Sequence, residues 1–222
     1  PQARGMSIDL RSSDWLRSHV PEHMHNRFTA VGGLDVQHLD YAKLESLVRE
    51  TWGIDLARVD VIHHSPMCES LSGASRDRTQ HYAPDGTTPI THLARYHLAC
   101  LRSVFTIFDR LATNGYQGII HSENPQAGFP KLPDVRRLAA RLGWRLLQHA
   151  DHCSNTCELD STFPKKPSCY LTYNVDPHLT LAQCHNDCPH RLPQHRTRHK
   201  LLICQRPNAR QFGQRVLRSV IT

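Results

Sequence analysis

Two short apolar runs that end in chemically reactive side chains limit most strongly what this chain can fold into. The first run, residues 59–63, leads into the loop that carries Cys68, and the second, residues 118–121, is followed closely by Glu123. Runs of this length are typical of buried strands, and an open α/β sheet presents reactive groups where its strands end. The sequence therefore predicts that the thiol of Cys68 and the carboxyl of Glu123 lie together at one edge of a sheet.

Strand and helix patterns alternate along the chain. Asp40 is placed to cap a helix over residues 41–51, and Gly53 is placed to stop it. The alternation predicts an α/β fold with a mainly parallel sheet covered by helices. The expected strands cover residues 6–10, 59–63, 118–121 and 144–149, and the expected helices cover residues 13–19, 41–51, 93–113 and 132–142.

Length and composition fit a globular protein with substantial loops. The chain has 222 residues, 39% of them hydrophobic, with 14 prolines and a mean hydropathy of −0.51. This length favours one domain, with two as the alternative. No run is long or apolar enough to span a membrane, and the amino terminus has no signal pattern and resembles the cut edge of a longer chain. We therefore expect an intracellular protein, nuclear or cytoplasmic, whose eight cysteines are reduced thiols or metal ligands rather than disulfides.

The charge balance favours an anionic partner. The formal net charge is +7, the pI is about 9.2, and seventeen histidines add positive charge under mild acid. Nucleic acid is the natural candidate. Many soluble proteins are equally basic without binding nucleic acid, so charge alone leaves both interpretations open.

Two motifs together resemble a known enzyme family. Residues 65–68, Ser-Pro-Met-Cys, resemble the Pro-Pro-Cys nucleophile loop of cytosine-C5 DNA methyltransferases, particularly their short phage-type members. Residues 123–125, Glu-Asn-Pro, resemble the Glu-Asn-Val or Glu-Asn-Pro motif of the same family, with the same order and spacing. The resemblance extends from about residue 5 to residue 195. It implies a Rossmann-like sheet of S-adenosylmethionine-dependent type, with Cys68 and Glu123 catalytic, Pro66 beside the cofactor, and Asn124 and Pro125 at the substrate.

The resemblance also implies cofactor contacts, with one clear departure. Asp9 resembles the acid that holds the ribose of S-adenosylmethionine, and Asp35-Val36 resembles the step beside the adenine. The family's first strand and its Phe-x-Gly-x-Gly turn have no counterpart, since only eight residues precede Asp9 and Gly32-Gly33 lies in the wrong place. We therefore expect a sheet that is incomplete at its N-terminal side. Either the missing strand lies elsewhere, or the domain keeps a catalytic pocket with little cofactor binding.

The chemistry explains why a thiol and an acid are needed together. C5 of cytosine is too weak a nucleophile to take a methyl group unaided, so a thiolate first attacks C6. The resemblance gives Cys68 this role, and it gives Glu123 the role of donating to N3 of a base flipped out of DNA. The alternatives are a buried structural thiol at Cys68 and a surface acid or helix cap at Glu123.

Further positively charged residues are candidates for contacts with DNA. The polar stretch of residues 72–91 is long enough to be a functional loop, in which Arg76 and Arg78 are candidate phosphate contacts. A plain polar loop is the alternative. Lys165 and Lys166, before residues 169–172, resemble the basic positions of phage-type relatives, although the family's usual arginines are replaced.

A Cys/His-rich stretch suggests zinc. Thiolate and imidazole suit a tetrahedral zinc ion, and unmetallated thiols with loop histidines are the alternative. We divide the chain into a catalytic domain, residues 1–178, and a basic segment, residues 179–222, that is either separate or part of the same domain. The candidate zinc ligands are Cys184, Cys188, His190 and His195.

These observations leave three hypotheses. The first is a DNA cytosine-C5 methyltransferase that forms a covalent Cys68 adduct and uses S-adenosylmethionine. The second is a basic nucleic-acid-binding module that keeps the fold without turnover. The third is an inert, degenerate fragment whose motifs are remnants. Cofactor binding separates the first from the others, and salt-dependent DNA binding separates the second from the third.

Overall fold

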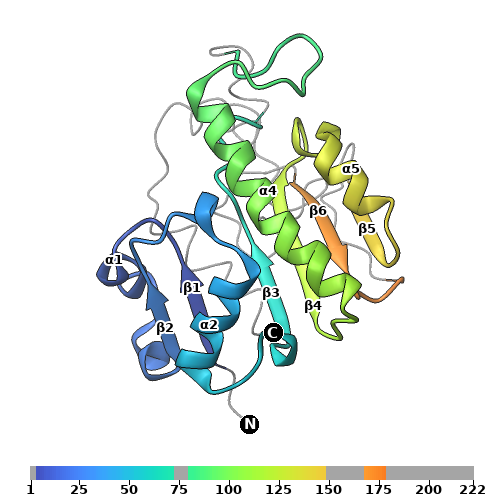
Figure 1. Cartoon of the computed structure of the whole chain (residues 1–222). Coiled ribbons are helices and arrows are strands. Elements are labelled where there is room, and N and C mark those ends of the chain that lie inside the picture. Colours follow the sequence, from blue (N-terminus) through green and yellow to red (C-terminus); the bar gives the residue numbers. More distant parts are fainter. Residues whose placement is uncertain (1–3, 73–79, 149–167, 179–222) are drawn as a thin grey trace, which may run out of the picture.

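A computed structural model describes residues 4–72, 80–148 and 168–178. Strands and helices alternate, and the three longest helices, α2, α4 and α5, lie on one side of the strands (Figure 1). The strands are β1 (Gly5–Ile8), β2 (Phe28–Val31), β3 (Val61–His64), β4 (Ile119–Pro125), β5 (Trp144–Gln148) and β6 (Ser168–Tyr173). The helices are α1 (Ser13–Arg17), α2 (Tyr41–Trp52), α4 (His92–Thr113) and α5 (Pro133–Ala139), with short 3-10 turns η1 (Glu22–Arg27), η2 (Val36–His38), η3 (Leu56–Arg58) and η4 (Phe129–Lys131).

The described strands form two sheets. Strands β1 and β2 pair in parallel, and the second sheet has the order β3-β4-β6-β5. Strands β3 and β4 are parallel, whereas β6 runs antiparallel between β4 and β5. Since β6 alone opposes its neighbours in the second sheet, the prediction of a mainly parallel, Rossmann-like α/β sheet is confirmed. The antiparallel insertion of β6 was not predicted, because no local sequence signal sets the order in which distant strands pair.

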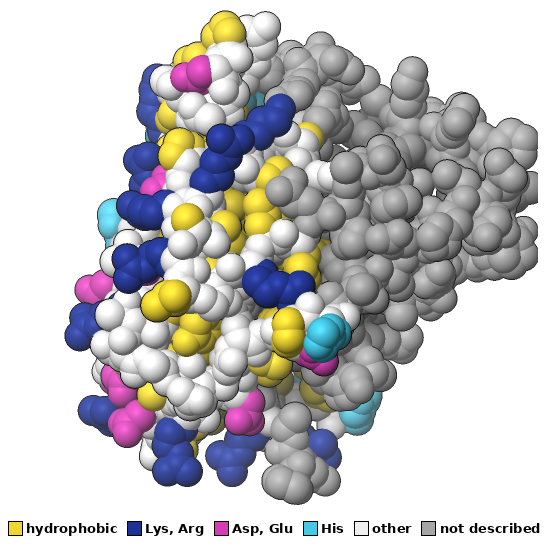
Figure 2. Space-filling view, turned by 90° about the vertical axis from the view of Figure 1, so that its right-hand side faces the viewer, with side chains coloured by type: hydrophobic (Ala, Val, Ile, Leu, Met, Phe, Trp, Pro, Cys, Tyr) yellow, Lys and Arg dark blue, Asp and Glu magenta, His cyan; other side chains and the backbone are white. Residues whose placement is uncertain are grey.

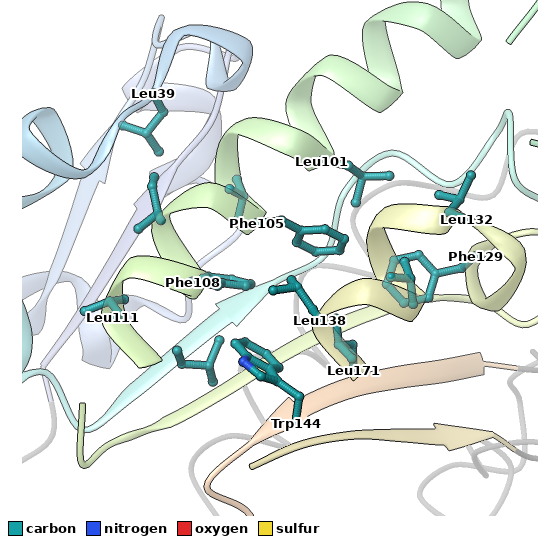
Figure 3. Packing of buried hydrophobic residues seen from close by; sticks show 14 of the residues in the cluster. Leu39, Leu101, Phe105, Phe108, Leu111, Phe129, Leu132, Leu138, Trp144 and Leu171 are labelled. Carbon is teal, nitrogen blue, oxygen red and sulfur yellow. The ribbon is translucent and has the colours of Figure 1, made fainter. Parts of the chain in front are cut away.

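The core lies between α4 and the four-stranded sheet. Phe105 and Phe108 of α4 are each 1% exposed, and Phe108 stacks on Trp144 of β5 with ring centroids 6.1 Å apart. Leu138 of α5 and Leu171 of β6 close the same cluster (Figure 3). The helix predicted for residues 93–113 therefore packs through one apolar face, and burial of that face stabilises this half of the molecule.

Helix ends follow the predicted caps where the signals are local. The Asp40 side chain accepts a hydrogen bond from the Lys43 amide at the start of α2, and Gly53 ends the helix with a φ of 69°. At α1, where the sequence predicted a helix over residues 13–19, the N-cap is Ser12, although Ser13 could equally serve as a cap. The correction is small because Ser12 and Ser13 are chemically equivalent as N-caps.

Two strands, β2 and β6, were not among those expected from the sequence. Strand β2 covers residues 28–31, ahead of the Gly32-Gly33 turn, and it pairs with β1. Gly32 has a packing reason for its identity, because a Cβ atom there would lie 2.1 Å from the backbone nitrogen of Ser13. Its amide also donates to the Ser13 hydroxyl. This glycine therefore holds β2 against the start of α1.

The smaller sheet is attached to the larger one through helices. The Tyr96 hydroxyl of α4 donates to Asp35 at 3.1 Å, and the Ser103 hydroxyl donates to the Leu39 carbonyl. The guanidinium of Arg110 lies over the ring of Tyr41. Helix α4 therefore links the two sheets. No helix in the described ranges has the length and apolar character needed to cross a membrane.

Candidate active site

The parallel pairing of β3 and β4 brings the two predicted catalytic segments to one edge. His63 lies opposite His121, and His64 lies opposite Ser122. One step beyond this ladder, the Ser65 hydroxyl donates to Glu123 Oε2 at 3.2 Å. The loop that carries Cys68 therefore starts at the Glu123 carboxylate.

A second hydroxyl holds the other oxygen of this carboxylate. Ser168, the first residue of β6, donates to Glu123 Oε1 at 2.6 Å. Glu123 is half-buried, and its two oxygens accept from two different segments of the chain. Charge-assisted bonds of this kind fix the direction of a carboxylate. The candidate acid is thus held in one orientation.

The Cys68 loop packs tightly against its neighbours. The thiol is half-buried, and the Leu71 amide donates to the Cys68 carbonyl at 3.1 Å to close a turn. Ser70, 6% exposed, hydrogen-bonds through its hydroxyl to Nδ1 of His97 on α4 at 2.7 Å. Gly128 meets the loop from the other side, where a Cβ atom would lie 2.9 Å from the Leu71 carbonyl oxygen. Residues 68–71 are therefore held between α4 and the segment after β4.

Neutral histidines lie on the Glu123 side of the sheet. Side chains alternate along a strand, so His63, His121 and Glu123 share one face. The rings of His63 and His121 meet edge to face at 4.4 Å. Burial, together with the nearby His121, lowers the pKa of His63 to about 4, and burial also lowers the pKa of His121. Both imidazoles are therefore uncharged at neutral pH.

The opposite face of the same strands is buried beneath α4. His64 hydrogen-bonds through Nδ1 to the Ser122 hydroxyl at 3.0 Å, and burial lowers the pKa of His64 to about 3. Asn124 is fully buried, and neither atom of its side-chain amide has a hydrogen-bond partner in the described part of the chain. Asn124 and Glu123 therefore point to opposite sides of β4, although they are neighbours in the sequence.

The predicted cofactor-binding acids also lie at strand ends. Asp9 follows β1 and Asp35 lies four residues beyond β2, and because these strands are parallel, both acids lie at the same end of the small sheet. Asp9 Oδ1 accepts from the Arg11 amide at 2.9 Å. Although burial raises the pKa of Asp35, hydrogen bonds from Gln37 and Tyr96 outweigh it, and the pKa lies below its ordinary value.

This end of the small sheet fits S-adenosylmethionine only in part. A carboxylate at a strand end suits the hydroxyl groups of a ribose, and Asp9 lies directly after β1. Gly32 packs against the start of α1, and the Gly33 amide donates to the Arg11 carbonyl at 2.9 Å, so this turn serves local structure. Among the described strands, β1 pairs only with β2 and β3 pairs only with β4. In the described part of the chain, no strand therefore joins the small sheet to the larger one.

Several predicted site residues lie outside the described ranges. They include both loop arginines, both lysines and all four candidate zinc ligands, and these assignments remain predictions. Within residues 4–72, 80–148 and 168–178, no group of three or more His, Cys, Asp or Glu side chains is arranged to hold a metal ion. The residues concerned are Arg76, Arg78, Lys165, Lys166, Cys184, Cys188, His190 and His195.

The residues that support the site were not predicted from the sequence. Ser65 and Ser168 hold Glu123, and the Ser70 and His97 pair holds the Cys68 loop. Ser65 and Ser168 each border a segment singled out in the sequence, so their positions carried a weak signal. His97 lies on the buried face of its helix, where an imidazole needs a polar partner.

The fold and this site define an α/β protein with a fixed carboxylate near the end of one parallel strand and a half-buried thiol in the loop that follows the adjacent strand. No protein-family model matches the chain, and no curated protein matches it. Among solved structures, the chain is similar to the Dnmt2 methyltransferase of S. pombe, with 12% sequence identity and a TM-score of 0.45. That similarity covers 78% of this chain, which spans 43% of the other chain's length.

Proposed function

We propose that this chain is a methyltransferase domain of cytosine-C5 type that acts on DNA, with Cys68 as nucleophile and Glu123 as its acid partner. The observation that carries the proposal is the hydrogen bond from Ser65 to Glu123. It joins the start of the Cys68 loop to the carboxylate at the carboxyl ends of two parallel strands, where open α/β sheets carry their reactive groups.

The proposed reaction uses the thiol of Cys68 to attack the base and the carboxyl of Glu123 to donate a proton to it. The Cys68 thiolate adds to C6 of a flipped cytosine, so that an S–C6 bond forms and the electron pair of the C5–C6 double bond becomes available at C5. Glu123 gives a proton to N3, which neutralises the negative charge that develops in the ring. S-Adenosylmethionine supplies the methyl group for C5. Water takes the C5 proton as the S–C6 bond breaks, and N3 returns its proton to Glu123, so the thiolate, the carboxyl group and the aromatic ring are all restored.

The residues around this pair supply orientation. Ser65 and Ser168 keep both oxygens of Glu123 in place, while Ser70 and His97 keep the Cys68 loop against α4. Fixing two reactive groups before the substrate arrives lowers the entropic cost of the reaction. Asp9 is the residue proposed to hold the ribose hydroxyls of the cofactor, with Asp35 and Val36 beside the adenine and Pro66 also at the cofactor.

Covalent trapping tests this proposal. The protein is incubated with S-adenosylmethionine and DNA that contains 5-fluorocytosine, since fluorine at C5 blocks the final elimination. We expect a denaturation-resistant adduct that requires the cofactor and is lost in Cys68→Ala. Cys100→Ala, which removes a buried thiol on α4, is the matched control and should still form the adduct. An adduct that survives Cys68→Ala would refute the assignment of the nucleophile.

Glu123 has its own test. Glu123→Gln keeps the size of the side chain and removes its acid, so we expect the rate of adduct formation to fall by about 10²-fold or more. DNA affinity should stay within about twofold, because the change is isosteric. An unchanged rate would remove Glu123 from the mechanism.

The second candidate is a nucleic-acid-binding module without turnover. The formal net charge of +7 and the pI of about 9.2 favour it, since a basic protein attracts the phosphates of nucleic acid. Titration calorimetry with S-adenosylmethionine discriminates the two functions. Binding supports the methyltransferase, whereas no binding together with intact DNA binding supports the module.

A further inference from the structure

The exposed charges on α4, α5 and the segment between them have one sign. Among residues 92–141, the exposed charged side chains are all basic, and the three acids, Asp109, Glu123 and Asp134, are half-buried or buried. We call this surface the α4–α5 basic face. Its members are Arg95, Arg102, Lys131, Arg136, Arg137 and Arg141, together with Arg110 near the end of α4.

The face is continuous. The α4 arginines at positions 95, 102 and 110 fall within a narrow arc of the helix, because they are separated by about two turns each. Helices α4 and α5 contact each other and lie on the same side of the sheet (Figure 1). Figure 2 shows Lys and Arg side chains gathered along the left edge, the side on which the helices of Figure 1 lie.

Asp109 and Asp134 form ion pairs with three of these arginines, and the arginine side chains remain exposed to solvent. Asp134 Oδ2 accepts from Arg102 Nε at 3.0 Å and Asp134 Oδ1 accepts from Arg137 at 3.2 Å, which joins α4 to α5. Arg141 Nε lies 3.0 Å from Asp109 Oδ1. The side chains of Arg102 and Arg137 nevertheless remain 61% and 65% exposed. The guanidinium groups are thus oriented at the surface, and positive charge remains in excess.

Helix α2 gives the matching contrast. Its exposed Lys43 and Arg49 are balanced by Glu50 and by Asp55 just beyond the helix. Arg49 pairs with Asp55 at 2.7 Å. A mixed surface of this kind is typical of an ordinary solvated helix. The single-sign surface is therefore a property of α4 and α5, not of every helix in the protein.

We propose that the α4–α5 basic face binds the sugar–phosphate backbone of a nucleic acid. Guanidinium groups match phosphate oxygens in geometry and charge. Helix α4 has 22 residues, which corresponds to about 33 Å, close to one turn of a DNA duplex. Its arginines therefore reach phosphates along much of that turn. This binding goes beyond the proposed methyl transfer, because it involves no reacting base and does not use Cys68.

The binding is sequence-independent and salt-dependent. Interactions with phosphates carry no base information, and each one releases a counterion from the nucleic acid. A variant that binds fewer phosphates should therefore show both a lower affinity and a flatter dependence on salt. Those two readouts together distinguish phosphate binding from a general loss of fold.

The test removes three basic side chains that have no acidic partner in the described structure. Arg95→Gln/Lys131→Gln/Arg136→Gln is compared with Arg17→Gln/Lys43→Gln/Arg58→Gln, which removes the same charge from exposed positions elsewhere. Fluorescence anisotropy with a labelled, random-sequence DNA duplex is measured over a range of salt concentrations. We expect the first variant to lose about tenfold in affinity or more, with a salt slope lower by about one for each phosphate that is no longer bound. The control should lose less than about threefold, and thermal melting should show both variants folded.

Three outcomes would overturn the proposal. The first is unchanged DNA binding in the face variant. The second is an equal loss in the face variant and the control, which would show that only net charge matters. The third is loss of binding to phosphatidylserine vesicles with DNA binding intact, which would assign the face to a membrane surface. Trapping with 5-fluorocytosine DNA is measured in parallel on the wild-type protein, so failure of trapping and failure of this proposal are separately visible.

Discussion

The two sheets of this molecule differ in how deeply their residues are buried. In the four-stranded sheet, β4 and β6 place Ile120 and Leu171 in the core with no exposure, beneath the aromatic side chains of α4. In the two-stranded sheet, no residue of β1 is buried, and Phe28 is the one buried residue of β2. Glu123 lies in a strand of the well-packed sheet, and Cys68 lies in a loop that follows one. Asp9 and Asp35 lie in the segments that follow the strands of the other sheet. The proposed reactive groups are therefore held by a well-buried sheet, whereas the proposed cofactor contacts are held by a sheet that buries little apolar surface.

The largest expected effect comes from the core of the larger sheet. Phe108→Ala removes a ring that is 1% exposed and stacks on Trp144, so we expect a loss of about 3–5 kcal/mol in the free energy of unfolding. Ile8→Ala in half-buried β1 should cost about 1 kcal/mol, because less apolar surface is removed from the core. Urea denaturation measures both. Equal costs would show that the two sheets are equally well packed.

The second largest effect is expected from low pH, which should lower the free energy of unfolding through histidines of the larger sheet. Three histidines have pKa values below the ordinary value of 6.5 in the folded state. The pKa is about 4 for His63 and about 3 for His64, and that of His121 is also lowered. The unfolded chain therefore takes up more protons below about pH 6.5, and the free energy of unfolding falls as the pH decreases toward 4. The shift at His63 alone corresponds to about 3 kcal/mol. Urea denaturation at several pH values measures the effect, and His63→Leu should flatten the profile. A profile that is already flat would contradict burial of neutral imidazoles.

Two matched serines separate stability from reactivity. Ser70 and Ser122 each hydrogen-bond to a histidine, His97 and His64 respectively. Removing either hydroxyl leaves a buried imidazole without that bond, so Ser70→Ala and Ser122→Ala should each cost about 1–3 kcal/mol. Only Ser70→Ala should change the rate at which iodoacetamide alkylates Cys68, as followed by peptide mass spectrometry. The same change in both variants would show that the Ser70 pair does not position the loop.

The smallest effect is expected at Asn124. Its amide is fully buried and without a hydrogen-bond partner in the described structure, so Asn124→Leu should change the free energy of unfolding by less than about 1 kcal/mol, or increase it. Asn174→Leu, which removes an amide that donates to the Gln117 carbonyl, serves as a control and should destabilise the protein. A large loss for Asn124→Leu in chemical denaturation would reveal a partner for this amide.

Local signals in the sequence predicted most of the helices and strands. They did not predict which distant segments contact one another. The Asp40 cap, the Gly53 stop and the buried face of α4 depend on neighbouring residues and follow directly from spacing. The proximity of the Cys68 loop and Glu123 was predicted because parallel strands end at one edge. The hydrogen bond from Tyr96 to Asp35 joins side chains 61 positions apart. No periodicity encodes such a pairing.

The position of β6 has a consequence for how the chain is assembled during synthesis. Strands β3 and β4 can pair once residue 125 has emerged from the ribosome, but β5 has β6 as its only partner among the described strands. Until residues 168–173 emerge, both β4 and β5 expose a row of unpaired backbone groups, which attract other chains. A nascent or truncated chain that ends before β6 should therefore be the form of this protein most prone to aggregation. The last described strand to be made is the one that closes the sheet.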